Sequence, residues 1–111
     1  MIEGLPEGSL TDREEIFGPV VTLAPFADEE EAVARANAVD YGLAATVFTA
    51  DLGRALRLAR RLECGMVWVN TWMLRDLRTP FGGVKQSGIG REGGFEALRF
   101  FTESRTVSLQ P

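Results

Sequence analysis

The chain has 111 residues, of which 45% are hydrophobic and 25% are charged, and its net charge is −4. A chain of this length can bury about two thirds of its unfolded surface, which is enough for one domain with a core of its own. The acidic balance argues against a nucleic-acid or anionic-membrane partner, and no apolar run is long enough to span a bilayer. The single cysteine, Cys64, cannot form an internal disulfide, and this predicts a cytoplasmic protein. The sequence has no histidine, so it offers no imidazole base and no plausible zinc site.

A short motif follows the polar lead-in formed by residues 1–13. Residues 14–20 (EEIFGPV) combine two carboxylates, an aromatic ring and a Gly-Pro pair directly before an apolar stretch. Two interpretations are open from spacing alone. In the first, the motif is a turn whose Phe17 packs into the core. In the second, it is a binding site, in which a carboxylate holds a polar ligand and the ring packs against a flat one.

Three apolar stretches alternate with two amphipathic helices in the next part of the chain. The strands are predicted over residues 20–24, 43–49 and 66–70. The helices are predicted to begin at Asp28 and Asp51, whose carboxylates suit the N-cap position. This alternation predicts an α/β fold in which a strand-helix-strand-helix-strand unit forms a layered sheet with parallel neighbours.

Charged residues cluster on both helices. The acidic run of residues 29–31 suits the positive end of the first helix dipole and is interpreted as a solvated helix start. The second helix carries four arginines, mostly away from its apolar side. They are Arg54, Arg57, Arg60 and Arg61. A nucleic-acid surface is rejected for them, because the chain as a whole is acidic and no aromatic residues alternate with them.

Residues 71–94 form a long glycine-rich segment without a clear period, and loops of this length are usually functional. Residues 88–93 match the G-x-G-x-x-G pattern, but no strand precedes them and no second strand with an acidic residue follows, so a dinucleotide fold is rejected here. The glycines are interpreted instead as positions of tight turning and close backbone approach. A helix is predicted over residues 95–101 and a strand over residues 105–109.

Five motifs together resemble the C-terminal part of the aldehyde dehydrogenase superfamily. They are residues 14–20 (EEIFGPV), 41–45 (YGLAA), 65–70 (GMVWVN), 80–92 (PFGGVKQSGIGRE) and 101–103 (FTE). Residues 72–79 (WMLRDLRT) more narrowly resemble the 2-hydroxymuconic and 2-aminomuconic semialdehyde dehydrogenases of aromatic-ring degradation.

The resemblance implies an oxidoreductase that converts a carboxylate-bearing semialdehyde to the acid with NAD or NADP. Glu15 would accept hydrogen bonds from the hydroxyls of the nicotinamide ribose, and Phe17 would pack against the ribose and the nicotinamide. Arg75 falls where the family lines its substrate tunnel, and it would bind the substrate carboxylate with Arg78 as second choice. Phe81 falls on another wall of that tunnel. The alternative for each arginine is a surface ion pair, with Asp76 as the candidate partner.

The family's nucleophilic cysteine and general-base glutamate lie upstream of the residues 14–20 motif, and Cys64 does not match the nucleophile. The chain is therefore expected to be the last fifth of a dehydrogenase, with no catalytic residue, no metal site and no cofactor bound by the chain alone. Residues 1–103 would be a partial catalytic domain, and residues 104–111 a strand for homo-oligomerisation. The expected partners are the missing N-terminal part and further copies of the enzyme. The alternative is an inactive packing or oligomerisation fragment.

Overall fold

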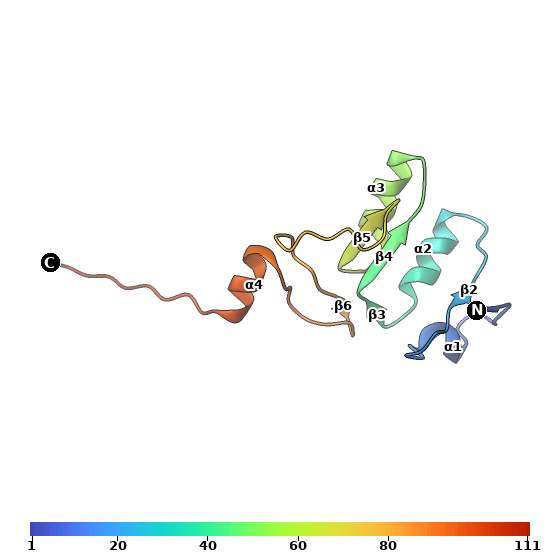
Figure 1. The fold of residues 1–111 in the computed structure, drawn as a ribbon, viewed down its shortest axis with the longest axis horizontal. Helices are drawn as coiled ribbons and strands as arrows, with labels where there is room; N and C mark the ends of the chain where they lie inside the picture. The colour runs from blue at the N-terminus through green and yellow to red at the C-terminus, as the bar shows by residue number, and fades with distance from the viewer.

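The computed structural model describes residues 1–111 as a series of short elements (Figure 1). Its strands are β1 (Ile2–Glu3), β2 (Thr22–Leu23), β3 (Tyr41–Gly42), β4 (Ala44–Val47), β5 (Met66–Val69) and β6 (Val84–Lys85). Its helices are α1 (Leu10–Arg13), α2 (Glu29–Asn37), α3 (Leu52–Arg61) and α4 (Gly94–Phe101). The predicted succession is confirmed in order as β2, α2, β4, α3 and β5, and the predicted last helix is confirmed as α4.

The prediction of one layered sheet is wrong, because the strands form three separate two-stranded sheets. β4 and β5 pair in parallel, with Thr46 opposite Trp68, as the α/β pattern requires. β2 instead pairs in parallel with β1, and β3 pairs antiparallel with β6. An apolar run identifies a strand but not the edge against which it pairs. The Ile2 N–H reaches the Val21 carbonyl at 2.9 Å and so gives β2 a partner outside the central pair.

Both long helices begin where their acidic caps predict. The Asp28 carboxylate accepts the Glu31 N–H at 2.9 Å, and the Asp51 carboxylate accepts the Arg54 N–H at 3.0 Å. The Glu31 side chain returns to the Ala27 N–H at 2.8 Å, one residue earlier than in the usual capping box. Local hydrogen bonding therefore fixes these two starts without help from distant residues.

Ion pairs connect the acidic start of α2 to the arginine face of α3. Glu29 lies 3.0 Å from Arg57 and 3.6 Å from Arg54, and Glu30 pairs with Arg61. The hydrogen bond from Arg57 is the largest cause that lowers the pKa of Glu29. Three of the four arginines, Arg54, Arg57 and Arg61, thus neutralise the start of the neighbouring helix and need no nucleic-acid ligand to explain them.

The chain does not form a closed core of its own, although its length would allow one. Five of the 111 residues are buried, and the apolar ones are Val33, Ala55 and Trp68. The Cα radius of gyration is 18.4 Å, whereas a closed domain of this length has one of about 13 Å. Large apolar side chains such as Phe48 and Leu98 lie exposed because no element of this chain packs over them.

The C-terminal tail extends away from α4 in Figure 1 and carries no regular secondary structure from residue 102 to residue 111. The strand predicted over residues 105–109 is therefore not formed within the chain. That strand was expected to pair with a second subunit, so its role in assembly stays a prediction. None of the helices has the length and apolar character that crossing a membrane requires.

Candidate functional site

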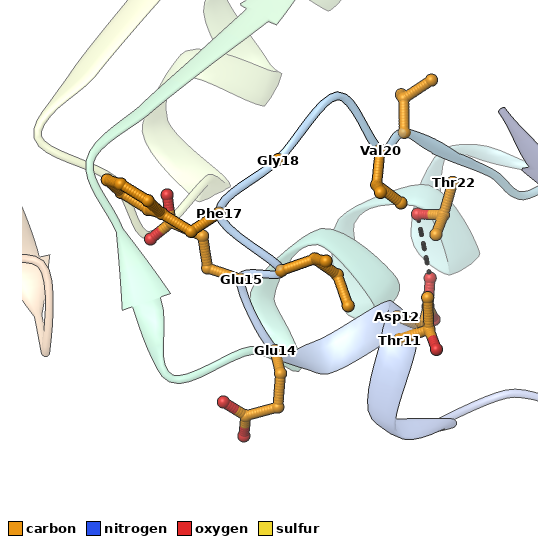
Figure 2. Close-up of a pocket in the computed structure, with 10 residues that line it drawn as sticks. Thr11, Asp12, Glu14, Glu15, Phe17, Gly18, Val20 and Thr22 are labelled. Atoms are coloured by element: carbon orange, nitrogen blue, oxygen red, sulfur yellow. Dashed lines mark hydrogen bonds between the residues drawn. The ribbon is translucent and has the colours of Figure 1, made fainter.

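The loop of residues 14–20 connects α1 to β2 and lines an open hollow of about 570 Å³ (Figure 2). The Glu14 N–H closes the last turn of α1 on the Leu10 carbonyl at 2.8 Å, and the helix ends there because Glu14 itself has an extended backbone, with a φ of −100° and a ψ of 144°. Phe17 has a φ of 54°, and this left-handed conformation costs a bulky side chain about 1–3 kcal/mol. Such strain is concentrated at functional sites.

The two neighbouring glutamates of this loop are not equivalent. The Tyr41 hydroxyl donates to Glu14 Oε2 at 3.5 Å, and the Glu14 charge is the main reason why the pKa of Tyr41 is raised. Figure 2 shows the Glu14 side chain directed away from Phe17, while the Glu15 side chain is drawn on the side of the Phe17 ring. Glu15 makes no hydrogen bond or ion pair within the chain. The carboxylate that is free to accept a ligand is therefore that of Glu15.

The Phe17 residue is 92% exposed, so it does not pack into a core within this chain. An exposed ring on a strained backbone, next to an unpaired carboxylate, is the arrangement that the binding-site interpretation requires. The ring offers a flat apolar face at low entropy cost, and the carboxylate offers acceptors for hydroxyl groups. These residues thus have the chemistry to hold a sugar-bearing ligand.

A second group of predicted residues meets in the loop after β5. The Arg75 guanidinium lies 4.4 Å from the centroid of the Phe81 ring and pairs with the Glu92 carboxylate. The structure therefore brings Arg75 and Phe81 together, as both substrate assignments require. Glu92 was missed in the sequence analysis. Its only signal is its place at the end of the residues 80–92 motif.

Arg78 lies apart from this group. Its side chain is 89% exposed and forms a fork of hydrogen bonds with Asp76, two residues before it. The hydrogen bond from Arg78 is the main cause that lowers the pKa of Asp76. The ion pair considered as the alternative role is thus present for both arginines, because Arg78 pairs with Asp76 and Arg75 pairs with Glu92 of another segment.

Cys64 is half-buried, and its thiol donates to the Met66 carbonyl at 3.2 Å. Burial raises the pKa of this thiol, so it stays protonated at neutral pH. The Glu15–Phe17 loop and the Arg75 loop line separate hollows. The chain therefore presents two separate candidate contact regions, and Cys64 lines neither of the two hollows.

Comparison with known proteins gives a consistent result. The aldehyde dehydrogenase family model matches residues 1–107. The chain is 53% identical over 110 residues to the 2-aminomuconic semialdehyde dehydrogenase of Danio rerio, covering 99% of this chain and 23% of that protein. It is 56% identical over 107 residues to the 2-hydroxymuconic semialdehyde dehydrogenase of Pseudomonas sp. (strain CF600), covering 96% of this chain and 22% of that protein.

Solved structures show the same similarity. The NAD+ complex of aldehyde dehydrogenase from Bacillus cereus superposes with a TM-score of 0.87 at 46% identity, covering 91% of this chain and 21% of that one. The chain thus spans less than a quarter of the length of the relatives that it matches.

Proposed function

The chain belongs to the aldehyde dehydrogenase family, and from this premise we propose that it supplies cofactor and substrate contacts to an NAD- or NADP-dependent semialdehyde dehydrogenase. The match of the family model to residues 1–107 confirms the aldehyde dehydrogenase resemblance that the five sequence motifs indicated. The proposed substrate is a carboxylate-bearing semialdehyde similar to hydroxymuconic semialdehyde, formed in the degradation of aromatic rings. The names of the relatives and the Arg75 group support this substrate class.

The cofactor contacts are assigned to the loop of residues 14–20. The observation that carries this assignment is the unpaired Glu15 carboxylate on the same loop as the exposed Phe17 ring. A carboxylate accepts hydrogen bonds from both hydroxyls of a ribose, and a rigid ring packs against a flat cofactor. NAD or NADP, when bound, supplies the acceptor for the hydride that leaves the aldehyde carbon. The two residues of this loop bind and orient, and they take no part in covalent chemistry.

The substrate contact is assigned to Arg75, with Phe81 beside it as a wall of the pocket. A guanidinium offers two parallel N–H donors that match a carboxylate in its plane. Arg78 is the second choice, because its donors already face Asp76. The nucleophilic thiol and the general base of the reaction are proposed to come from the remaining part of the enzyme.

Glu15 can be tested in a hybrid enzyme in which this chain replaces the matching segment of the Pseudomonas 2-hydroxymuconic semialdehyde dehydrogenase. In this hybrid, Glu15→Gln is expected to raise the Kd of the cofactor about tenfold, because a charged hydrogen bond is worth about 1.5–3 kcal/mol. Fluorescence titration with the cofactor measures it. Glu14→Gln is the matched control, and its expected effect is smaller because Glu14 faces Tyr41. If Glu15→Gln changes neither the Kd of the cofactor nor the rate of hydride transfer, Glu15 does not contact the cofactor ribose.

A second candidate function is a packing or oligomerisation module without activity of its own. The low burial favours it, since apolar residues of α4 such as Phe95, Leu98 and Phe101 are exposed and suited to contact another chain. The two functions differ in one outcome. Joined to the rest of a dehydrogenase, this chain supports NADH formation if it supplies the cofactor and substrate contacts, and it fails to do so if it is only a packing module.

A further inference from the structure

Phe81 and Glu92, the two residues that contact the Arg75 guanidinium, are themselves bound to each other. The Phe81 N–H donates to the Glu92 carbonyl at 2.8 Å, and the Glu92 N–H donates to the Phe81 carbonyl at 2.7 Å. They form an isolated antiparallel bridge between segments eleven residues apart. The face of the guanidinium lies on the Phe81 ring, while Nη2 pairs with Glu92. This one backbone bridge therefore fixes the positions of both residues that contact Arg75 relative to each other.

The loop that carries Arg75 is fixed on both sides of this residue. Before it, the buried Trp68 donates Nε1–H to the Leu74 carbonyl at 2.8 Å. After it, the Gly94 N–H donates to the Leu77 carbonyl at 3.1 Å. Gly93 has a φ of 76°, and a Cβ there would lie 2.6 Å from the Thr79 carbonyl oxygen. The loop and the residues 92–94 segment thus touch through their backbones, which only glycine allows at this place.

We propose that Glu92 is a positioning residue for Arg75 and thereby determines the preference of the enzyme for acidic semialdehydes. This inference rests on the proposed function, in which Arg75 binds the substrate carboxylate. Glu92 occupies one donor of the guanidinium, and Phe81 occupies one face. The other donors keep a fixed direction toward the substrate.

The reason for such an arrangement is the flexibility of arginine. An arginine side chain has about 2 kcal/mol of rotamer entropy, and ordering it only when the ligand arrives weakens binding by part of that amount. The Phe81–Glu92 bridge orders Arg75 in advance. Glu92 also brings a negative charge near the proposed carboxylate site, which acts in the opposite direction. Removing the Glu92 charge therefore raises KM for the acidic substrate if Glu92 positions Arg75, and lowers it if Glu92 mainly repels the substrate carboxylate.

The chain offers a matched control on α4. Arg99 lies 5.0 Å from the centroid of the Phe95 ring and 3.6 Å from Glu96, so it has the same kinds of partner as Arg75. Its side chain is 68% exposed, and all three residues belong to one helix. Glu96→Gln therefore removes a carboxylate from a similar group that is not proposed to bind substrate.

The test compares Glu92→Gln and Glu96→Gln in the hybrid enzyme, with 2-hydroxymuconic semialdehyde and an uncharged aliphatic aldehyde as substrates. We expect Glu92→Gln to raise KM for the acidic substrate about tenfold, with a smaller change in kcat and in the KM of the uncharged aldehyde. Glu96→Gln is expected to leave the ratio of the two KM values unchanged. Combining Glu92→Gln with Arg75→Ala should add little to Arg75→Ala alone, because both changes remove the same oriented guanidinium.

Each outcome has one meaning. A lower KM for the acidic substrate in Glu92→Gln would show repulsion and overturn the positioning role, and so would an unchanged KM ratio. If Arg75→Ala itself leaves the KM ratio unchanged, the carboxylate assignment of the proposed function fails first. A crystal structure of the Glu92→Gln hybrid gives a readout that does not depend on activity. The positioning role predicts that the Arg75 guanidinium leaves the Phe81 ring, and an unmoved guanidinium contradicts it.

Discussion

Replacing Arg75 by alanine in the hybrid enzyme is expected to lower kcat/KM for 2-hydroxymuconic semialdehyde by the equivalent of about 2–5 kcal/mol. The loss is large because the substrate carboxylate would be bound without its cationic partner. An uncharged aliphatic aldehyde has no carboxylate to lose and should show a much smaller change. Steady-state kinetics with both substrates measure the difference.

A change to lysine distinguishes charge from geometry at this position. Arg75→Lys keeps the positive charge but removes the planar fork and the stacking on Phe81. Its kcat/KM for the acidic substrate should therefore lie between those of the unmodified hybrid and Arg75→Ala. Losses of equal size for charged and uncharged aldehydes in Arg75→Ala would mean that Arg75 supports the loop and does not recognise a carboxylate.

Replacing Trp68 by alanine is expected to destabilise the fold by about 3–5 kcal/mol. Trp68 is the largest of the buried apolar residues, and it lies on β5 opposite Thr46 of β4. Its Nε1–H also secures the Leu74 carbonyl directly before Arg75. The variant should therefore lower both the urea midpoint of the hybrid enzyme and its selectivity for the acidic substrate.

Trp68→Phe separates the two contributions of this side chain. Phenylalanine keeps most of the apolar packing and removes only the hydrogen bond to Leu74, which is worth about 1 kcal/mol. We expect a small change in the urea midpoint with a measurable loss of selectivity. An unchanged midpoint in Trp68→Ala would contradict the stabilising role assigned to the buried Trp68 side chain.

The parts of the fold that depend on local chemistry could be predicted from the sequence. Asp28 and Asp51 begin helices because a short acidic side chain satisfies free N–H groups within the same turn. The interpretation of the glycines after Phe81 as positions of close backbone approach is confirmed for Gly93 against Thr79 and for Gly94 against Arg78, but Gly88 has no such neighbour. These features involve residues near each other in the chain or a property that only one residue type has.

The parts that depend on long-range pairing could not be predicted. β2 has the composition of a sheet strand, yet only the position of β1 decides its partner. The residue pattern does not divide the roles of Glu14 and Glu15, because Tyr41, which binds Glu14, lies 27 residues away. Only the family resemblance indicated Glu15. Glu92 was missed for the same reason, since its bridge to Phe81 exists only in the folded loop.

The candidate site was predicted mainly from the family motifs and less from the pattern of residue types. Spacing alone left Phe17 open to a core role, and its exposure in the structure shows that it packs into no core within this chain. The apolar faces were correctly identified, but a pattern cannot show that their partners lie outside the chain. Phe48 is an example, because it is apolar, directly follows β4 and is 75% exposed.

The central claim is that this chain supplies the cofactor and substrate contacts of a dehydrogenase whose covalent chemistry resides elsewhere. The most direct measurement is NADH formation at 340 nm from 2-hydroxymuconic semialdehyde, with the chain alone and the hybrid enzyme at equal concentration. The account predicts NADH formation by the hybrid and none by the 111-residue chain. NADH formation by the chain alone, or a correctly folded hybrid that forms none, would contradict it.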